Sequence, residues 1–148
     1  MFRGSFSHTL DDKGRVIIPA RFRNIIQTEG GDAVILTEKD NCLYGYTLNE
    51  WSAFEKRIKS MADMSDTFRR YLRRLVGSVQ ECTFDKQGRI VIPPEMRSYA
   101  GLEKEVELVG VLDHFEIWSP ENRTIENEKL EKELQQVEVR NEIAKLGL

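Results

Sequence analysis

The chain has 148 residues, 40% of them hydrophobic and 32% charged, which suits one compact domain or two small halves. It has no apolar run near the roughly 20 residues of a membrane span, and residues 1–10 lack the apolar core of a secretory signal, so we expect a cytoplasmic protein without a membrane partner. The formal net charge of −3 counts against nucleic-acid binding until the positions of the charges are considered.

The first predicted element is a turn at residues 11–15, where the sequence reads Asp-x-x-Gly-Arg between two apolar stretches. Its glycine can adopt the positive φ of a tight turn, and its aspartate can accept backbone N–H bonds. Residues 16–18 are apolar and predict a returning strand. Pro19 ends that strand and can begin a short helix over residues 20–26. A second hairpin follows over residues 34–46.

Two helices are predicted in the middle of the chain. The first has apolar residues at helical spacing from Trp51 to Met61, with Asn49 as a plausible N-cap. The second has a full apolar stripe from Phe68 to Val79. Four arginines fall on its opposite face, and such a charge run is more often a solvated face or a subunit contact than a DNA-binding face. These arginines are Arg69, Arg70, Arg73 and Arg74.

The turn and its flanks recur later in the chain. Residues 83–93 repeat residues 9–19 at a constant spacing of 74, and Arg97 repeats Arg23. The second copy again predicts a turn, a returning strand and a helix over residues 94–99, followed by a hairpin over residues 106–118. An internal repeat of this kind determines the architecture. We therefore expect the two copies to pack together, with Val16, Ile18, Ile90 and Ile92 in one core.

The C-terminal segment is rich in glutamate and lysine and predicts one long helix. The sequence thus divides into a first half at 1–47, connecting helices at 48–79, a second half at 80–119 and the helix at 120–148. Residues 1–24 carry five basic and two acidic side chains, whereas residues 120–146 carry five basic and seven acidic ones. A net acidic chain can therefore still present a basic surface to phosphate.

Catalysis and metal binding are not expected. His8, Cys42, Cys82 and His114 are scattered, whereas a zinc site needs closely spaced ligands. The sequence has no Ser-His-Asp set, glycine-rich phosphate loop or HExxH motif. We therefore predict a protein that is not an enzyme and that has neither a cofactor nor a small-molecule ligand. The two cysteines are expected to be buried or half-buried thiols in a reducing compartment.

The doubled Asp-x-x-Gly-Arg-x-x-x-Pro motif resembles the hairpin of AbrB-type regulators. With the Met-Phe-Arg-Gly opening and Leu-Val-Gly before Phe-Glu-Ile-Trp, the chain resembles the MraZ family. The resemblance implies an α+β fold, a double swapped-hairpin β-barrel with flanking helices, and homo-oligomers that form rings. It also implies a nucleoid-associated, sequence-specific regulator that binds double-stranded DNA at repeated promoter sites and represses the division and cell-wall gene cluster. The alternative is an antitoxin-like module that binds DNA with its hairpins and a protein with its tail.

The resemblance also predicts which residues bind DNA. Arg15 and Arg89 match the family's turn arginine, and Arg23 and Arg97 match the arginine after the proline helix. An arginine on a turn can contact guanine or phosphate, but it can equally form a salt bridge to the aspartate four residues earlier. The second copy has Gln87 in place of the first copy's lysine. The predicted DNA-binding set is Arg15, Arg89, Lys13, Lys86, Arg23, Arg97 and Arg3.

Overall fold

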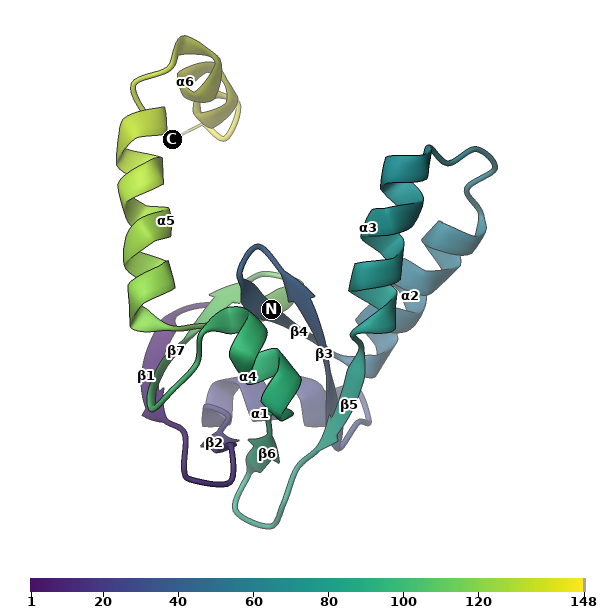
Figure 1. Cartoon of the computed structure of the whole chain (residues 1–148), viewed down its shortest axis with the longest axis vertical. Coiled ribbons are helices and arrows are strands. Elements are labelled where there is room, and N and C mark those ends of the chain that lie inside the picture. The colour runs from purple at the N-terminus through teal and green to yellow at the C-terminus, as the bar shows by residue number, and fades with distance from the viewer. Residues whose placement is uncertain (148) are drawn as a thin grey trace.

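The computed structural model describes residues 1–147 as a mixed α+β protein (Figure 1). The elements follow one another as β1 (Ser5–Thr9), β2 (Arg15–Ile17), α1 (Ala20–Thr28), β3 (Ala33–Lys39), β4 (Cys42–Tyr46), α2 (Leu48–Lys59), α3 (Asp66–Gly77), β5 (Gln80–Thr83), β6 (Arg89–Val91), α4 (Pro94–Ala100), β7 (Glu105–Val111), β8 (His114–Trp118), α5 (Pro120–Glu133) and α6 (Val137–Ala144). None of these helices is long and apolar enough to cross a membrane.

The strands form a six-stranded antiparallel sheet in the order β1-β7-β8-β4-β3-β5, and β2 and β6 form a separate two-stranded ribbon. The hairpins predicted at residues 34–46 and 106–118 are present as β3–β4 and β7–β8. The hairpins expected at the two Asp-x-x-Gly-Arg turns are not formed, because the strands that return from these turns, β2 and β6, pair with each other. The remaining strands pair across the two copies, β1 with β7 and β3 with β5. The expectation of a closed barrel is wrong: β1 and β5 are the two edges of an open sheet, because the three-residue strands β2 and β6 pair with each other and not with these edges.

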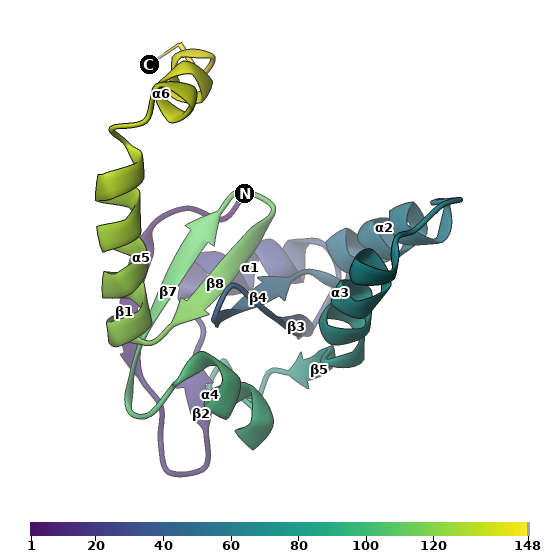
Figure 2. The ribbon, with the colours of Figure 1, turned by 45° about the horizontal axis from the view of Figure 1, so that its top comes forward.

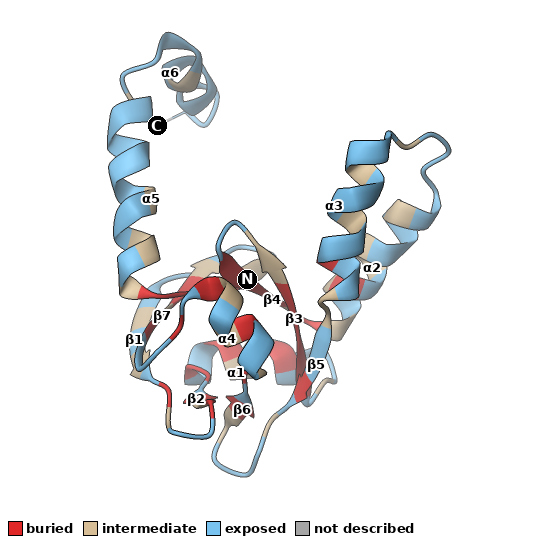
Figure 3. Cartoon of the chain, in the orientation of Figure 1, coloured by how far each residue is buried: buried red, intermediate tan, exposed pale blue. Residues whose placement is uncertain are grey.

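One hydrophobic core combines both copies of the repeat. Val16, Ile18, Ile90 and Ile92 lie in the same cluster and are each at most 1% exposed, as the repeat predicted. Helices α1 and α4 pack against this cluster through their buried faces. Figure 3 shows buried residues concentrated on the strands and on these two helices, while α3 and α5 are mostly exposed. The two halves therefore share their hydrophobic stabilisation and fold as one unit.

Helices α2 and α3 form an antiparallel arm that is attached to the sheet at its base. Trp51 and Leu75 pack against Ile35 of β3 in a smaller cluster. The N-cap of α2 is Thr47, whose hydroxyl accepts a 3.1 Å hydrogen bond from the Glu50 N–H, and not the expected Asn49. Threonine can cap here because its extended backbone lets the side-chain oxygen reach the N3 amide.

The single long C-terminal helix that was expected is two helices. α5 ends at Glu133, and α6 begins after Gln136, which has an extended backbone. The Arg140 guanidinium donates from Nε to the Leu134 carbonyl at 3.2 Å, across the break. Neither helix has a buried residue, and the contacts of α5 with the sheet are at its first turns, so nothing in the described structure holds residues 134–136 in a helix. Residue 148 of the predicted helix lies outside the described residues. α5 projects from the sheet on the side away from the α2–α3 arm (Figures 1 and 2).

Candidate nucleic-acid interface

The first turn is held by the carboxylate of Asp11. One carboxylate oxygen accepts 2.9 Å hydrogen bonds from the backbone N–H groups of Lys13 and Arg15, and the other accepts a 2.5 Å bond from the Arg15 Nε. Gly14 has a φ of +78° and donates its N–H to the Asp11 carbonyl at 3.0 Å. An aspartate three residues before the glycine thus closes the turn and fixes the arginine that follows it.

The second turn repeats this geometry. Asp85 accepts 2.9 Å bonds from the backbone N–H groups of Gln87 and Arg89, and a 2.8 Å bond from the Arg89 Nε. Gly88 has a φ of +77°. Because position 87 contributes its backbone N–H, the replacement of lysine by glutamine leaves the turn intact and removes only one positive charge.

The two turns meet through the β2–β6 ribbon. Val16 pairs with Ile90, and the amides of Ile18 and Ile92 donate to the carbonyls of Gly88 and Gly14 at 3.1 and 2.8 Å. The Nη1 of Arg89 lies 3.9 Å from the Asp11 carboxylate, so the two turns are also in electrostatic contact. Figure 1 shows both turns at one edge of the molecule, opposite the free ends of α3 and α5.

The outer face of the ribbon combines charge with exposed aliphatic groups. In register, Arg15 lies opposite Val91, and Arg89 lies opposite Ile17. Ile17 and Val91 are 42% and 51% exposed, whereas their neighbours Val16 and Ile90 are at most 1% exposed. Alternate residues of a strand point to opposite faces, so these four side chains share one surface. The sequence placed only Val16, Ile18, Ile90 and Ile92 in the core, but Ile17 and Val91 were not among the predicted DNA-binding residues; the period-two alternation of the two strands was the signal that could have identified them.

Hydrogen bonds keep the aspartates of the two turns ionised. The backbone N–H of Arg15, helped by its guanidinium and by the Lys13 amide, lowers the pKa of Asp11 below its usual value. Asp85 has its pKa lowered in the same way by Arg89 and Gln87. Both carboxylates are therefore ionised at neutral pH. Each arginine binds its aspartate through Nε, and among residues 1–147 the Nη groups of Arg15 have no hydrogen-bond partner. The salt bridge thus orients the guanidinium and leaves its bidentate end accessible.

The arginines after the two prolines cross between the copies. Arg23 donates from Nη1 to the Ile18 carbonyl, and Arg97 donates from Nε to the Ile92 carbonyl, both at 3.0 Å. A Cβ atom on Gly88 would lie 2.9 Å from the Arg23 Cδ, so each of these arginines lies over the turn of the other copy. Both are half-buried. Each packs against the turn of the other copy, while its guanidinium group is already hydrogen-bonded to the backbone of its own copy.

The other predicted residues differ in position. Lys13 and Lys86 are exposed on the two turns, beside the ribbon face. Arg3 is exposed but lies at the far end of β1, next to the bridge between Phe2 and Leu112. The structure thus brings Lys13 and Lys86 together with the turn arginines, and places Arg3 elsewhere.

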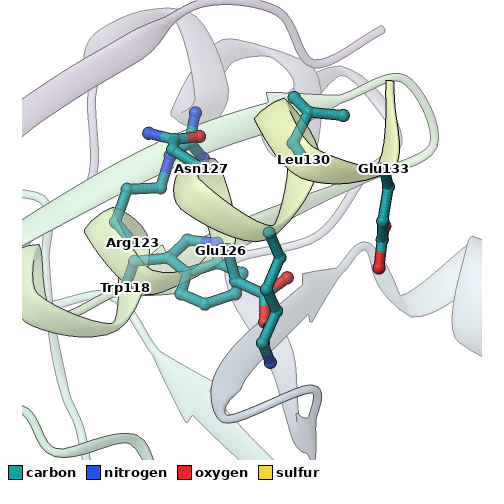
Figure 4. Close-up of a pocket in the computed structure, with 7 residues that line it drawn as sticks. Trp118, Arg123, Glu126, Asn127, Leu130 and Glu133 are labelled. Atoms are coloured by element: carbon teal, nitrogen blue, oxygen red, sulfur yellow. Dashed lines mark hydrogen bonds and ion pairs between the residues drawn. The ribbon is translucent and has the colours of Figure 1, made fainter. Parts of the chain in front are cut away.

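A shallow pocket lies against α5, away from the turns (Figure 4). It is lined mainly by Trp118, Arg123, Glu126 and Leu130. Cys42 and Cys82 are buried free thiols, as predicted. Burial raises the pKa of Cys82 to about 11, so this thiol is protonated at neutral pH.

The fold and site define a class of protein: two cross-paired copies of one β-turn motif, each presenting an aspartate-braced arginine at the same edge. Comparison with known proteins finds the same two-copy organisation in one family. The profile of the MraZ protein family, described as antitoxin-like, matches twice, at residues 1–74 and 75–144. A Transcriptional regulator MraZ from Desulforapulum autotrophicum is 55% identical over the full length of both chains, and one from Desulfosudis oleivorans is 43% identical, also over both full lengths. One from Limosilactobacillus fermentum is 44% identical over 82% of each chain. The chain belongs to the MraZ family.

Proposed function

We propose that this chain is a sequence-specific transcriptional regulator that contacts double-stranded DNA with the β2–β6 ribbon and its two turns. The observation that carries the proposal is the outer face of the ribbon, where Arg15 and Arg89 flank the exposed side chains of Ile17 and Val91. The major groove of B-DNA admits a two-stranded ribbon. There the Nη groups of Arg15 and the guanidinium of Arg89, which lies 3.9 Å from the Asp11 carboxylate, would bind guanine or phosphate, and the aliphatic groups would contact thymine methyls.

The site contains no strong excess of positive charge, so one subunit would bind weakly. Several copies in one homo-oligomer, a ring in this proposal, would engage repeated promoter sites at the same time. Linking sites in this way raises the overall affinity by about 10²–10⁴-fold without new contacts. The relatives are named transcriptional regulators. By the resemblance, the targets are the promoter repeats of the division and cell-wall gene cluster, the effect is repression, and the protein is located on the nucleoid in the cytoplasm.

The proposal includes the relation of the fold to AbrB-type regulators. β1 and β2 of the first copy pair with β7 and β6 of the second, which supports a swapped-hairpin arrangement within one chain. In this division, residues 1–47 and 80–119 are the two halves, residues 48–79 connect them and residues 120–148 follow. The antitoxin-like alternative requires a partner-binding tail, and such tails are typically disordered when free. Here residues 120–133 form a helix, which favours the regulator.

A gel-shift titration tests the proposed function. The probes are the promoter of the organism's own division gene cluster and a scrambled DNA of the same length and composition, at physiological salt. We expect tighter binding to the promoter, with an affinity that falls steeply as salt increases because phosphate contacts release counterions. Equal affinity for the two DNAs would contradict sequence specificity. Co-purification of one stoichiometric partner protein in place of DNA would favour the antitoxin-like alternative.

A further inference from the structure

A pocket of about 300 Å³ lies between the N-terminal segment, residues 1–4, and helix α1. Arg3 belongs to the segment, and Arg21 and Asn24 belong to α1, where a spacing of three residues puts them on one face of the helix. Phe22 and Ile25 contribute apolar surface to the lining. Within residues 1–147, no acidic side chain lines the pocket, so its formal charge is entirely positive.

The two arginines of this pocket form no ion pair within the described chain. Both are exposed, and among residues 1–147 neither lies within salt-bridge distance of an acidic side chain. The turn arginines Arg15 and Arg89, by contrast, each bind an aspartate. Arg3 and Arg21 can therefore direct their guanidinium groups to a ligand, and two guanidinium groups at one pocket suit an oxyanion.

The backbone that carries Arg3 is fixed on both sides. The Phe2 N–H donates to the Leu112 carbonyl at 2.8 Å, the Leu112 N–H donates back to the Phe2 carbonyl at 2.9 Å, and the Gly110 N–H donates to the Gly4 carbonyl at 2.8 Å. A Cβ atom on Gly110 would overlap the backbone nitrogen of Arg3, so glycine allows the segment to lie this close to β7. The segment thus lies against the β7–β8 hairpin (Figure 2), and Arg3 projects from an ordered position.

The second copy of the repeat does not preserve this charge. At the spacing of 74, Gly77 corresponds to Arg3, and Glu95 corresponds to Arg21. Arg21 and Glu95 are both exposed near the start of their helices, yet they have opposite charge. Helices α1 and α4 pack against the same core, so packing makes the same demands on both copies. A basic pocket that is present in one copy alone therefore indicates a ligand.

We propose that the pocket formed by Arg3, Arg21 and Asn24 binds a phosphate group. The two guanidinium groups bind its oxygens through charge-assisted hydrogen bonds, and the Asn24 amide donates one more. Phe22 and Ile25 contact the part of the ligand that carries the phosphate. Two sources offer this group: a phosphodiester of bound DNA, or a free phosphorylated small molecule. The inference rests on the proposed function only for the first source.

Isothermal titration calorimetry with inorganic phosphate at physiological salt tests the pocket. The double variant Arg3→Gln, Arg21→Gln should bind phosphate at least about tenfold more weakly, because each lost arginine removes hydrogen bonds to a charged group. Asn24→Ala changes no charge and should weaken binding several-fold. The control is Arg70→Gln, Arg73→Gln, which removes the same charge from exposed positions of α3 and should bind like the unaltered chain. Thermal melting verifies that each variant is folded.

A gel shift with the promoter DNA over a range of salt concentrations distinguishes the two sources. If DNA supplies the phosphate, the Arg3→Gln, Arg21→Gln variant should lower the slope of log affinity against log salt by about one to two, since each phosphate contact contributes about 0.9. If a free molecule supplies it, DNA binding is unchanged and calorimetry alone reports the loss.

Three results would overturn the phosphate site. The first is agreement between the unaltered chain and the Arg3→Gln, Arg21→Gln variant in both measurements. The second is an equal loss of phosphate binding in the α3 control, and the third is unchanged binding by Asn24→Ala; in both cases the attraction would follow net charge and not the pocket. If the unaltered chain binds no promoter DNA, the proposed function fails, and calorimetry still decides whether the pocket binds phosphate.

Discussion

The side chain of Arg97 lies directly over Gly14, with its Cζ only 2.9 Å from where a Cβ atom of residue 14 would be. Gly14 belongs to the first turn, and Arg97 belongs to the helix of the second copy. Arg23 and Gly88 have the reciprocal relationship. The two glycines therefore serve two purposes: they provide the positive φ of each turn, and they allow a guanidinium group from the other copy to approach the backbone.

Gly88→Ala should destabilise the protein by about 2–3 kcal/mol, because alanine is strained at positive φ and its methyl group would displace Arg23. Urea denaturation measures this loss as a lower midpoint with an unchanged slope. Gly77→Ala is the matched control: residue 77 ends α3 with open space around it, so alanine there should stabilise by about 0.4–1 kcal/mol. Equal effects of the two substitutions would contradict the crossed packing.

Arg15→Ala should weaken binding to the promoter DNA by about 1–3 kcal/mol for each subunit contact, and the loss recurs at each bound subunit of an oligomer. Arg15→Lys should lose most of the same affinity, since lysine keeps the charge but lacks the two-pronged Nη end. Affinity at physiological salt, melting temperature and mass are measured on one preparation. Parallel loss of melting temperature and affinity would mean that Arg15 only braces the turn against Asp11. Unchanged affinity would contradict direct contact.

The two neighbouring residues Ile90 and Val91 should separate stability from binding. Ile90 is 1% exposed in the shared core, so Ile90→Ala should cost about 2–5 kcal/mol of folding free energy. Val91 is 51% exposed on the outer face, so Val91→Ser should change stability by no more than about 0.5 kcal/mol. The same substitution should weaken binding to the promoter several-fold, as measured by gel shift. Unaltered affinity would remove the ribbon face from the DNA interface.

Acid should unfold the protein partly through its two turns. The folded pKa values of Asp11 and Asp85 are lower than their usual 3.8, so their ionised forms stabilise the folded state. This contribution is complete above pH 3.8 and is lost as the pH falls through the lowered folded values. The double variant Asp11→Asn, Asp85→Asn should therefore show a weaker dependence of melting temperature on pH in that window. Parallel curves for the variant and the unaltered chain would contradict this linkage.

The internal repeat was sufficient to predict the turns, the two short helices after the prolines and the shared core. It was harder to predict which strands pair. Whether β2 returns along β1 or crosses to β6 depends on tertiary contacts that local sequence patterns do not contain. The break at residues 134–136 was missed for a related reason: helical periodicity continues through it, but the segment has no packing partner that would keep it helical.

Prediction of the site succeeded where the chemistry is local. The spacing of Asp11 and Arg15 already indicated a salt bridge, and the structure shows that bridge in both copies. The sequence pattern could not show that Arg23 lies over Gly88, because that contact joins residues 65 positions apart in sequence. The DNA-binding roles of Arg15, Arg89, Lys13 and Lys86 remain predictions.

The cross-pairing has a consequence for synthesis on the ribosome. β1 can find its partner only after β7 (Glu105–Val111) has left the exit tunnel, and β2 must wait for β6. At about 5–20 residues per second, the N-terminal strands stay unpaired for on the order of several seconds. During that interval their edges and the future core residues Val16 and Ile18 are open to other nascent chains and to chaperones. A message truncated between the two copies therefore yields a chain without a partner for its first strands, and its expected fate is aggregation or proteolysis.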